Sequence, residues 1–251
     1  MKAKCKALTF IAILVLLTLF ISNFSFSQEA ETEKKNDEVR GYLMLGGSKL
    51  DIDALNERLV SKGQSSFSDG FLSFGGGFLR KKNSNWLFGV EGHYLFIEEK
   101  DYTVPNGSYK TSLTGAYGFV DIGYALVSSG GLNIYPLIGF GGGGAGLQIG
   151  KSNFDDILEQ PERNVNLTAG AFLLNFAIGS DYLIKSKESE KDEGGLVLGF
   201  RAGYTYSPWK GAWWTDNISI DGGPKIGMTG PYFRLMIGFG GKGEWWNEGK
   251  K

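Results

Sequence analysis

The strongest constraint on the fold is a two-residue alternation that recurs in glycine- and aromatic-rich runs after residue 38. In the run 86–103, large apolar side chains share one parity, whereas Glu91 and His93 take the other. Four later runs repeat this pattern, with isolated charges opposite a nearly continuous apolar face. Side chains of a β-strand point alternately to its two faces. Each run therefore predicts a strand with one apolar face and one sparsely charged face.

Eight such runs are separated by connections of alternating character. The runs cover residues 39–50, 70–80, 86–103, 108–127, 131–150, 167–185, 195–209 and 230–241. The short or strongly polar connections are 81–85, 128–130 and 185–194, and the longer ones are 51–69, 100–108, 152–166 and 207–230. Successive antiparallel strands place all the short turns at one end and all the long loops at the other, as in outer-membrane barrels. The facing of the run 131–150 stays open, because nearly all its residues are apolar or glycine.

These patterns predict an all-β chain, an eight-stranded antiparallel up-and-down transmembrane β-barrel with a short helix in the first outer loop. After the N-terminal leader, no apolar run is long enough for a membrane helix. A sheet that spans lipid must close, because open edges would leave backbone groups unpaired. Apolar side chains outside and charges inside are typical of membrane barrels. A soluble, lipocalin-like periplasmic binder is the alternative, and it would reverse the two faces.

The N-terminus predicts export and a three-part organisation: a signal peptide over 1–27, a polar linker over 28–38 and the barrel over 39–251. Three lysines precede an apolar run that ends in small residues before Gln28. An uncleaved anchor helix is the alternative. The only cysteine, Cys5, lies in the leader, so the mature chain has no disulfide or thiolate chemistry. The 26 basic residues include three in the leader, which leaves 23 against 27 acidic ones and argues against a nucleic-acid partner.

Six polar side chains are predicted to face the lumen: Glu91, His93, Asp121, Asp181, Arg201 and Arg234. Counting along the strands places the five charged residues within about two residues of one level, with Asp181 slightly lower, so that they could meet across a narrow barrel. The prevailing interpretation is a structural plug of ion pairs, because an unpaired buried charge is costly. An ion pathway is the functional alternative, as is an acid–base pair of Glu91 and His93. We predict no catalytic residue, metal site or cofactor.

Two features point to the outer mouth and the membrane edges. Residues 51–63 predict a helix, capped by Asp51 or Asp53 and ended by Gly63, that packs on the rim or acts as a lid or partner-binding element. Four tryptophans are predicted to form interface girdles, with ligand contact as the alternative at the outer edge. They are Trp86 at the periplasmic edge and Trp209, Trp213 and Trp214 at the outer edge.

The mature chain resembles the small eight-stranded outer-membrane barrels of the OmpA-like and OmpX-like group, especially those common in Bacteroidota. The resemblance rests on the leader end SFS–Q and on the segments LSFGGGF (72–78), YPLIGFGGG (135–143) and PYFRLMIGFG (231–240). It covers essentially the whole mature chain. Because residues 240–251 follow the aromatic Phe239, the end of the last strand stays open.

This resemblance implies a non-enzymatic protein in the outer membrane, with a structural or surface-interaction role. It implies contact with outer-membrane lipid, insertion by the outer-membrane assembly machinery and outer loops open to an extracellular ligand. Two alternatives remain, a lipid-modifying barrel enzyme that uses His93 and Glu91 and a narrow channel or small-solute porin. Near His93 the sequence lacks the histidine–serine and aspartate–histidine arrangements of the enzymatic relatives.

Overall fold

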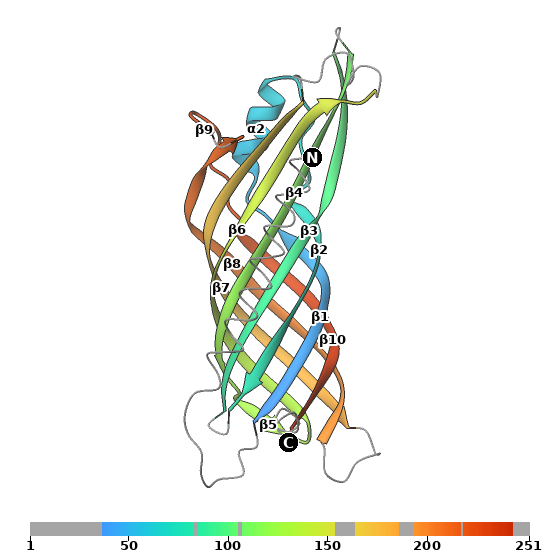
Figure 1. Cartoon of the computed structure of the whole chain (residues 1–251), viewed down its shortest axis with the longest axis vertical. Coiled ribbons are helices and arrows are strands. Elements are labelled where there is room, and N and C mark those ends of the chain that lie inside the picture. The colour runs from blue at the N-terminus through green and yellow to red at the C-terminus, as the bar shows by residue number, and fades with distance from the viewer. Residues whose placement is uncertain are drawn as a thin grey trace, which may run out of the picture. The chain divides into compact units, whose positions relative to one another are not determined.

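The structure, a computed structural model, describes residues 37–82, 85–104, 107–153, 164–185, 193–216 and 218–242. Within these residues, eight long strands close an antiparallel ring in which each strand pairs with its neighbours along the chain (Figure 1). They are β1 (Glu38–Lys49), β2 (Gly70–Lys81), β3 (Trp86–Val104), β4 (Gly107–Tyr124), β6 (Leu132–Lys151), β7 (Val165–Lys185), β8 (Glu193–Thr215) and β10 (Gly230–Lys242). Because β10 pairs with both β8 and β1, the ring is closed. The predicted eight-stranded up-and-down barrel is confirmed; the signal peptide lies outside the described residues.

The alternation sorts the side chains as predicted. Phe88 and Phe176 are 42% and 47% exposed on the outside of the barrel, whereas Glu91 and Asn175 on the same two strands are buried. The structure also determines the facing of β6, which the sequence left open. Its Phe140 is 49% exposed outside, and its small or glycine residues of the other parity line the interior.

The two ends of the barrel differ (Figure 1). One end carries β5 (Val127–Ser129), which pairs with β6, and we call it the lower end. The other, the upper end, carries α2 (Asp53–Ser61) and β9 (Ile218–Ile220). The described strand ends that flank the connections predicted as short lie at the lower end, and those that flank the connections predicted as long lie at the upper end.

One predicted loop is a strand extension. Residues 100–108 were expected to form a long loop, but β3 and β4 stay paired up to Val104 and Gly107. A bulge between Leu95 and Glu98 lets β3 continue, and the rings of Tyr102 and Tyr109 stack across the pair with centroids 5.4 Å apart. β8 likewise runs to Thr215 instead of 209. The extension of the β3–β4 pair is polar and therefore resembles a loop, because above the barrel both faces of a strand can meet water.

The predicted helix is present, but its start differs from the expectation. Ile52 occupies the N-cap position and no side chain caps the helix, so the predicted caps by Asp51 or Asp53 are wrong. The C-terminal end follows the prediction. Gly63 has a φ of 75°, its N–H donates to the carbonyl of Val60 at 2.9 Å, and the Gln64 N–H donates to that of Leu59 at 3.0 Å. These two backbone hydrogen bonds together form the Schellman motif. Among the residues described, no helix is long and apolar enough to cross a membrane.

Candidate functional site

The middle of the barrel interior contains a charged layer centred on Glu91. Arg201 of β8 and Arg234 of β10 are directly opposite each other in the ladder, and both are fully buried. Like charges in this position repel. Glu91, from β3 on the other side of the ring, forms an ion pair with Arg201 and lies 3.2 Å from Nη1 of Arg234. One carboxylate therefore contacts both guanidinium groups and offsets part of their charge.

Asp121 and His93 complete this layer. The Asp121 carboxylate lies 4.0 Å from Nη1 of Arg201, and Nε2 of His93 lies 3.5 Å from the Glu91 carboxylate. The His93 ring fills space that Gly75 leaves, since a Cβ there would collide with the ring. The side chains of His93 and Glu91 are 0% and 1% exposed, so no substrate can reach the pair in this structure.

Several polar side chains of this layer were missed in the sequence. Arg234 donates from Nη2 to the Tyr117 hydroxyl at 2.8 Å, and that hydroxyl lies 3.1 Å from Oγ of Ser48. The Tyr232 hydroxyl donates to the Asn175 amide oxygen at 2.8 Å. Inward parity could have identified them, because Tyr117 shares the parity of Asp121 on β4. The sequence reading looked for charges and passed over aromatic residues with a polar tip.

Asp181 lies lower, as residue counting indicated, but it belongs to a separate layer instead of joining the charges around Glu91. It forms an ion pair with Arg40, and it accepts hydrogen bonds from the hydroxyls of Tyr42 at 2.9 Å and Tyr135 at 2.7 Å. Arg40 also pairs with Glu38. Asp181 lies two residues further down β7 than Gly179, the ladder partner of Arg201. At this lower level, Arg40 and the two tyrosine hydroxyls surround its carboxylate.

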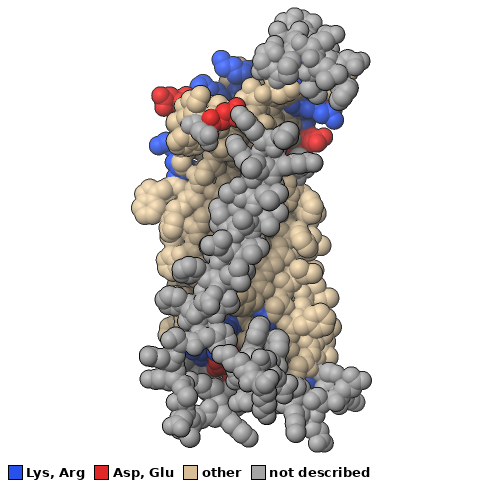
Figure 2. All heavy atoms as spheres, in the orientation of Figure 1, with Lys and Arg blue, Asp and Glu red and all other residues tan. Residues whose placement is uncertain are grey.

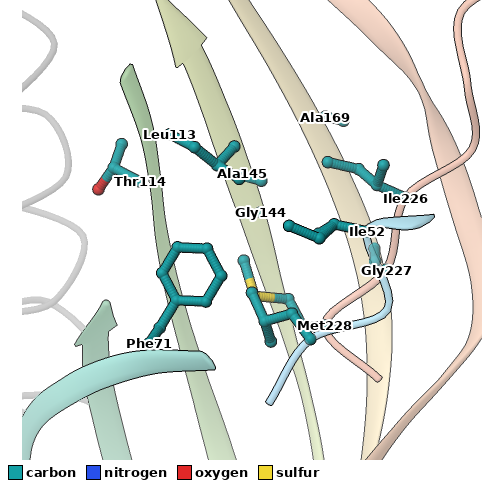
Figure 3. A pocket seen from close by; sticks show the side chains of 12 residues that line it. Ile52, Phe71, Leu113, Thr114, Gly144, Ala145, Ala169, Ile226, Gly227 and Met228 are labelled. Atoms are coloured by element: carbon teal, nitrogen blue, oxygen red, sulfur yellow. The ribbon is translucent and has the colours of Figure 1, made fainter. Parts of the chain in front are cut away.

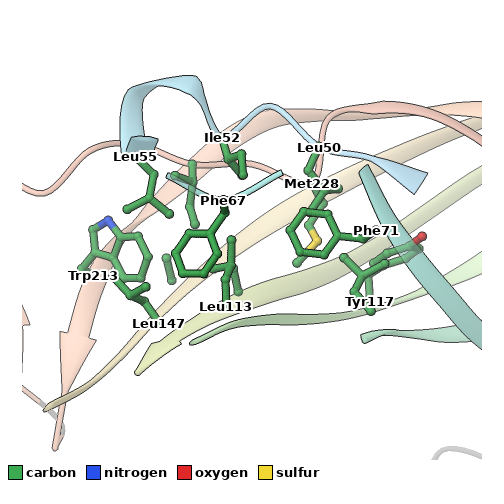
Figure 4. Close-up of a cluster of buried hydrophobic side chains, with 14 of the residues drawn as sticks. Leu50, Ile52, Leu55, Phe67, Phe71, Leu113, Tyr117, Leu147, Trp213 and Met228 are labelled. Atoms are coloured by element: carbon green, nitrogen blue, oxygen red, sulfur yellow. The ribbon is translucent and has the colours of Figure 1, made fainter. Parts of the chain in front are cut away.

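The upper interior is an apolar plug (Figure 4). From α2, Leu55 and Leu59 point into the barrel, and Phe67 joins them from the connection to β2. The opposite wall consists of Leu113 and Leu147 from β4 and β6. Ile52, Ile226 and Met228 fill the space between them. No charged side chain belongs to this cluster.

Trp213 lies in the plug, so the prediction that it belongs to an interface girdle is wrong. It is only 3% exposed, and its Nε1 donates to the carbonyl of Pro224 at 2.7 Å. Two register shifts between β7 and β8 change which residues of β8 face inward, so Trp213 points in although Trp209, of the same parity, points out. The three other tryptophans predicted for the girdles point outward: Trp86, Trp209 and Trp214 are 47%, 69% and 46% exposed.

The described part of the interior is filled. The cavity between the plug and the wall has a volume of about 10 Å³, lined by Ile52, Phe71, Leu113 and Met228 among others (Figure 3). That volume is enough for one water molecule at most. Within the described residues, no group of three or more His, Cys, Asp or Glu side chains could hold a metal ion.

Comparison with protein-family models and with curated protein sequences finds no match. Among solved structures, the chain is similar to Ail, the attachment invasion locus protein of Yersinia pestis, solved in complex with the heparin analogue sucrose octasulfate. That likeness has 12% identity and a TM-score of 0.38 and covers 84% of this chain and 99% of that one. Neisserial surface protein A, NspA, is similar at 14% identity and a TM-score of 0.38, with the same coverage. The barrel assignment rests on the strand pairing of this chain itself.

Proposed function

We propose that this chain is a non-enzymatic outer-membrane β-barrel of the OmpA-like and OmpX-like group, of the kind common in Bacteroidota. Its sealed barrel would anchor a surface that interacts with the outside. The observation that carries the proposal is the inversion of polarity: the outward side chains are apolar and the inward layers hold the charges. In a water-soluble barrel the same outer surface would be an apolar patch far larger than soluble monomers expose.

The outer surface supports this placement in a bilayer. Leu235 and Ile178 are 60% and 62% exposed in the middle of their strands. On the face that Figure 2 shows, the visible charged side chains gather towards the ends and leave an uncharged belt between them. Aromatic pairs mark both edges of the belt. Trp86 packs edge-on against Tyr124 near the lower end, and Trp209 packs against Phe172 nearer the upper end.

Orientation and export complete the proposal. We place the upper end outside, because long connections of outer-membrane barrels face outward and short turns face the periplasm. The leader 1–27 would be cleaved, residues 28–38 would link it to the barrel domain 39–251, and the assembly machinery would insert the barrel into outer-membrane lipid. The partner would be an extracellular ligand at the upper loops.

The two alternative functions have less support. A lipid-modifying enzyme needs a route from lipid to His93, and the buried side chains of His93 and Glu91 offer none. A channel needs a continuous opening, and the described interior is filled at all three levels. Lipid A from cells with the His93→Ala variant should have an unchanged mass spectrum. The purified protein should give no conductance steps in planar bilayers.

The decisive test asks whether the barrel exists in membranes. Boiled and unboiled samples of membrane-extracted protein should migrate differently on a denaturing gel, because a closed barrel resists detergent. Carbonate should leave the protein in the membrane fraction. Identical migration, together with release by carbonate, would overturn the proposal and favour the soluble binder.

A further inference from the structure

A polar groove of about 380 Å³ lies at the upper end, between α2 and the connection that follows β9. One stripe of α2 lines it with Ala54, Glu57, Arg58 and Ser61, at the spacing of residues that share a helix face. The other wall is formed by Gly222 and Pro224. The volume is in the range of pockets that hold small ligands, about 300–1,000 Å³.

Both walls of the groove are held in place by buried contacts. The opposite stripe of α2, Leu55 and Leu59, is packed into the barrel mouth. On the second wall, the Pro224 carbonyl accepts the hydrogen bond from the buried Trp213 indole. Gly223, which lies between Gly222 and Pro224 in the sequence, is so close to the indole that a Cβ on it would collide with the ring. The groove is therefore formed before any ligand arrives, which lowers the entropic cost of binding.

A polar contact joins the two walls without closing the groove. Nη2 of Arg58 donates to the Gly222 carbonyl at 3.3 Å. A guanidinium carries five N–H donors, so this single bond leaves others that can reach a ligand. Ser61 donates its hydroxyl hydrogen to the Arg58 carbonyl at 2.8 Å, which leaves its oxygen as an acceptor.

The chemistry of the lining selects a ligand class. Glu57 supplies an anionic acceptor and Arg58 a cationic donor. The Glu57 carboxylate therefore repels a purely anionic ligand, and the Arg58 guanidinium repels a purely cationic one. A hydroxyl group both donates and accepts, and it can satisfy both neighbours at once. We infer that the groove binds a neutral saccharide of a surface glycan. This inference rests on the proposed function, because it requires the upper end to face outside.

The test uses the full mature chain in lipid nanodiscs on an array of neutral, sialylated and sulfated glycans. The wild type should bind neutral glycans. The Ala54→Phe variant fills the groove without changing its charge, and Arg58→Ala removes the cationic donor. Arg58→Ala should weaken binding about tenfold or more, the effect of losing a hydrogen bond to a charged group. Ala54→Phe should weaken it at least as much, because its ring takes the space of the saccharide. The matched control is Lys62→Ala, an exposed residue next to the helix but outside the groove, which should bind like the wild type.

Other outcomes would overturn the inference. Binding to sulfated or sialylated glycans alone would indicate an anion site elsewhere. Neutral-glycan binding that survives Ala54→Phe would place the saccharide outside the groove, and no binding at all would refute the ligand class. Each sample is first checked for the gel shift of the folded barrel. A shifted sample that fails to bind refutes only the groove, whereas a sample without the shift refutes the proposed function.

Discussion

At the residue scale, Glu91 occupies the position on which the middle layer depends. Two arginines that are direct partners in a β-ladder are tolerated because its carboxylate reaches both of them from across the lumen. Asp121 is a weaker partner, since it lies 4.0 Å from Arg201. Removing one partner of a buried ion pair costs more than the pair contributes, because the remaining charge stays buried without compensation.

We therefore expect Glu91→Ala to lower the free energy of unfolding by about 3–5 kcal/mol. Urea unfolding in lipid vesicles, followed by the gel shift, measures it. The matched control is Glu99→Ala on the upper part of β3, where the Glu99 side chain is 61% exposed and lies 3.6 Å from Lys110. Exposed ion pairs contribute about 1 kcal/mol or less. Equal losses for the two variants would contradict the role assigned to Glu91.

Trp213 and its neighbour Trp214 provide a second test at this scale. They are consecutive on β8, but Trp213 is buried in the plug and Trp214 is 46% exposed outside. Replacing a buried tryptophan with alanine leaves a large cavity and costs about 3–5 kcal/mol. Trp213→Ala should therefore destabilise the protein much more than Trp214→Ala in the same urea titration. The reverse order would show that β8 has the opposite facing at its upper end.

At the scale of elements, the end of α2 depends on one backbone conformation. Gly63 has a φ of 75°, and an added Cβ would meet nothing within 4 Å. The cost of Gly63→Ala is then backbone strain alone, about 1–2 kcal/mol. Hydrogen exchange of the α2 amides should accelerate by roughly five- to thirtyfold.

The matched control for this helix is Gly70→Ala, because a Cβ there would lie at an ordinary 3.7 Å from Oγ of Ser68. It should leave the exchange of α2 unchanged. Unchanged exchange in Gly63→Ala as well would mean that the plug holds the helix without its C-terminal motif.

The elements that could be predicted are those in which one face meets a uniform medium. Along the part of each strand that lies in the belt, nearly every outward residue is apolar. Residues such as Phe88 and Phe176 therefore show the two-residue alternation that identifies a strand. Above the belt that contrast disappears, and the upper parts of β3 and β4 therefore resemble loops. Trp213 was placed in a girdle for another reason: the register shifts between β7 and β8 change the facing on either side of Trp209, and the sequence pattern does not reveal them.

The candidate site was predictable for the same reason, and only in part. Inward charges such as Glu91 and Arg201 stand out against an apolar strand. Their partners include residues that the charge pattern did not identify, so Asp181 was expected to join the Glu91 layer instead of pairing with Arg40. Arg40 was missed because it stands at the very start of its run, beside the polar linker.

At the scale of the whole molecule, the interior has three layers that differ in polarity and in role. Two charged layers, around Arg40 and around Glu91, lie in the lower and middle barrel among buried apolar side chains such as Met44 and Leu137. The apolar plug fills the upper end of the barrel. It holds α2 in an orientation that exposes the polar stripe of the helix at the surface. The sealed interior thus confines specific recognition to the upper surface, where the groove lies between α2 and Pro224.

The final prediction concerns the outer belt, because an apolar outer surface distinguishes a membrane barrel from a soluble one. Phe140 is 49% exposed near the middle of β6. In a bilayer, Phe140→Arg should cost about 2–4 kcal/mol, the penalty for arginine at the membrane midplane. Thr103→Arg, at the exposed tip of the β3–β4 hairpin, should cost almost nothing. Urea unfolding in vesicles measures both variants. If Phe140→Arg were as harmless as Thr103→Arg, the belt would face water, and the inverted polarity would need a different explanation.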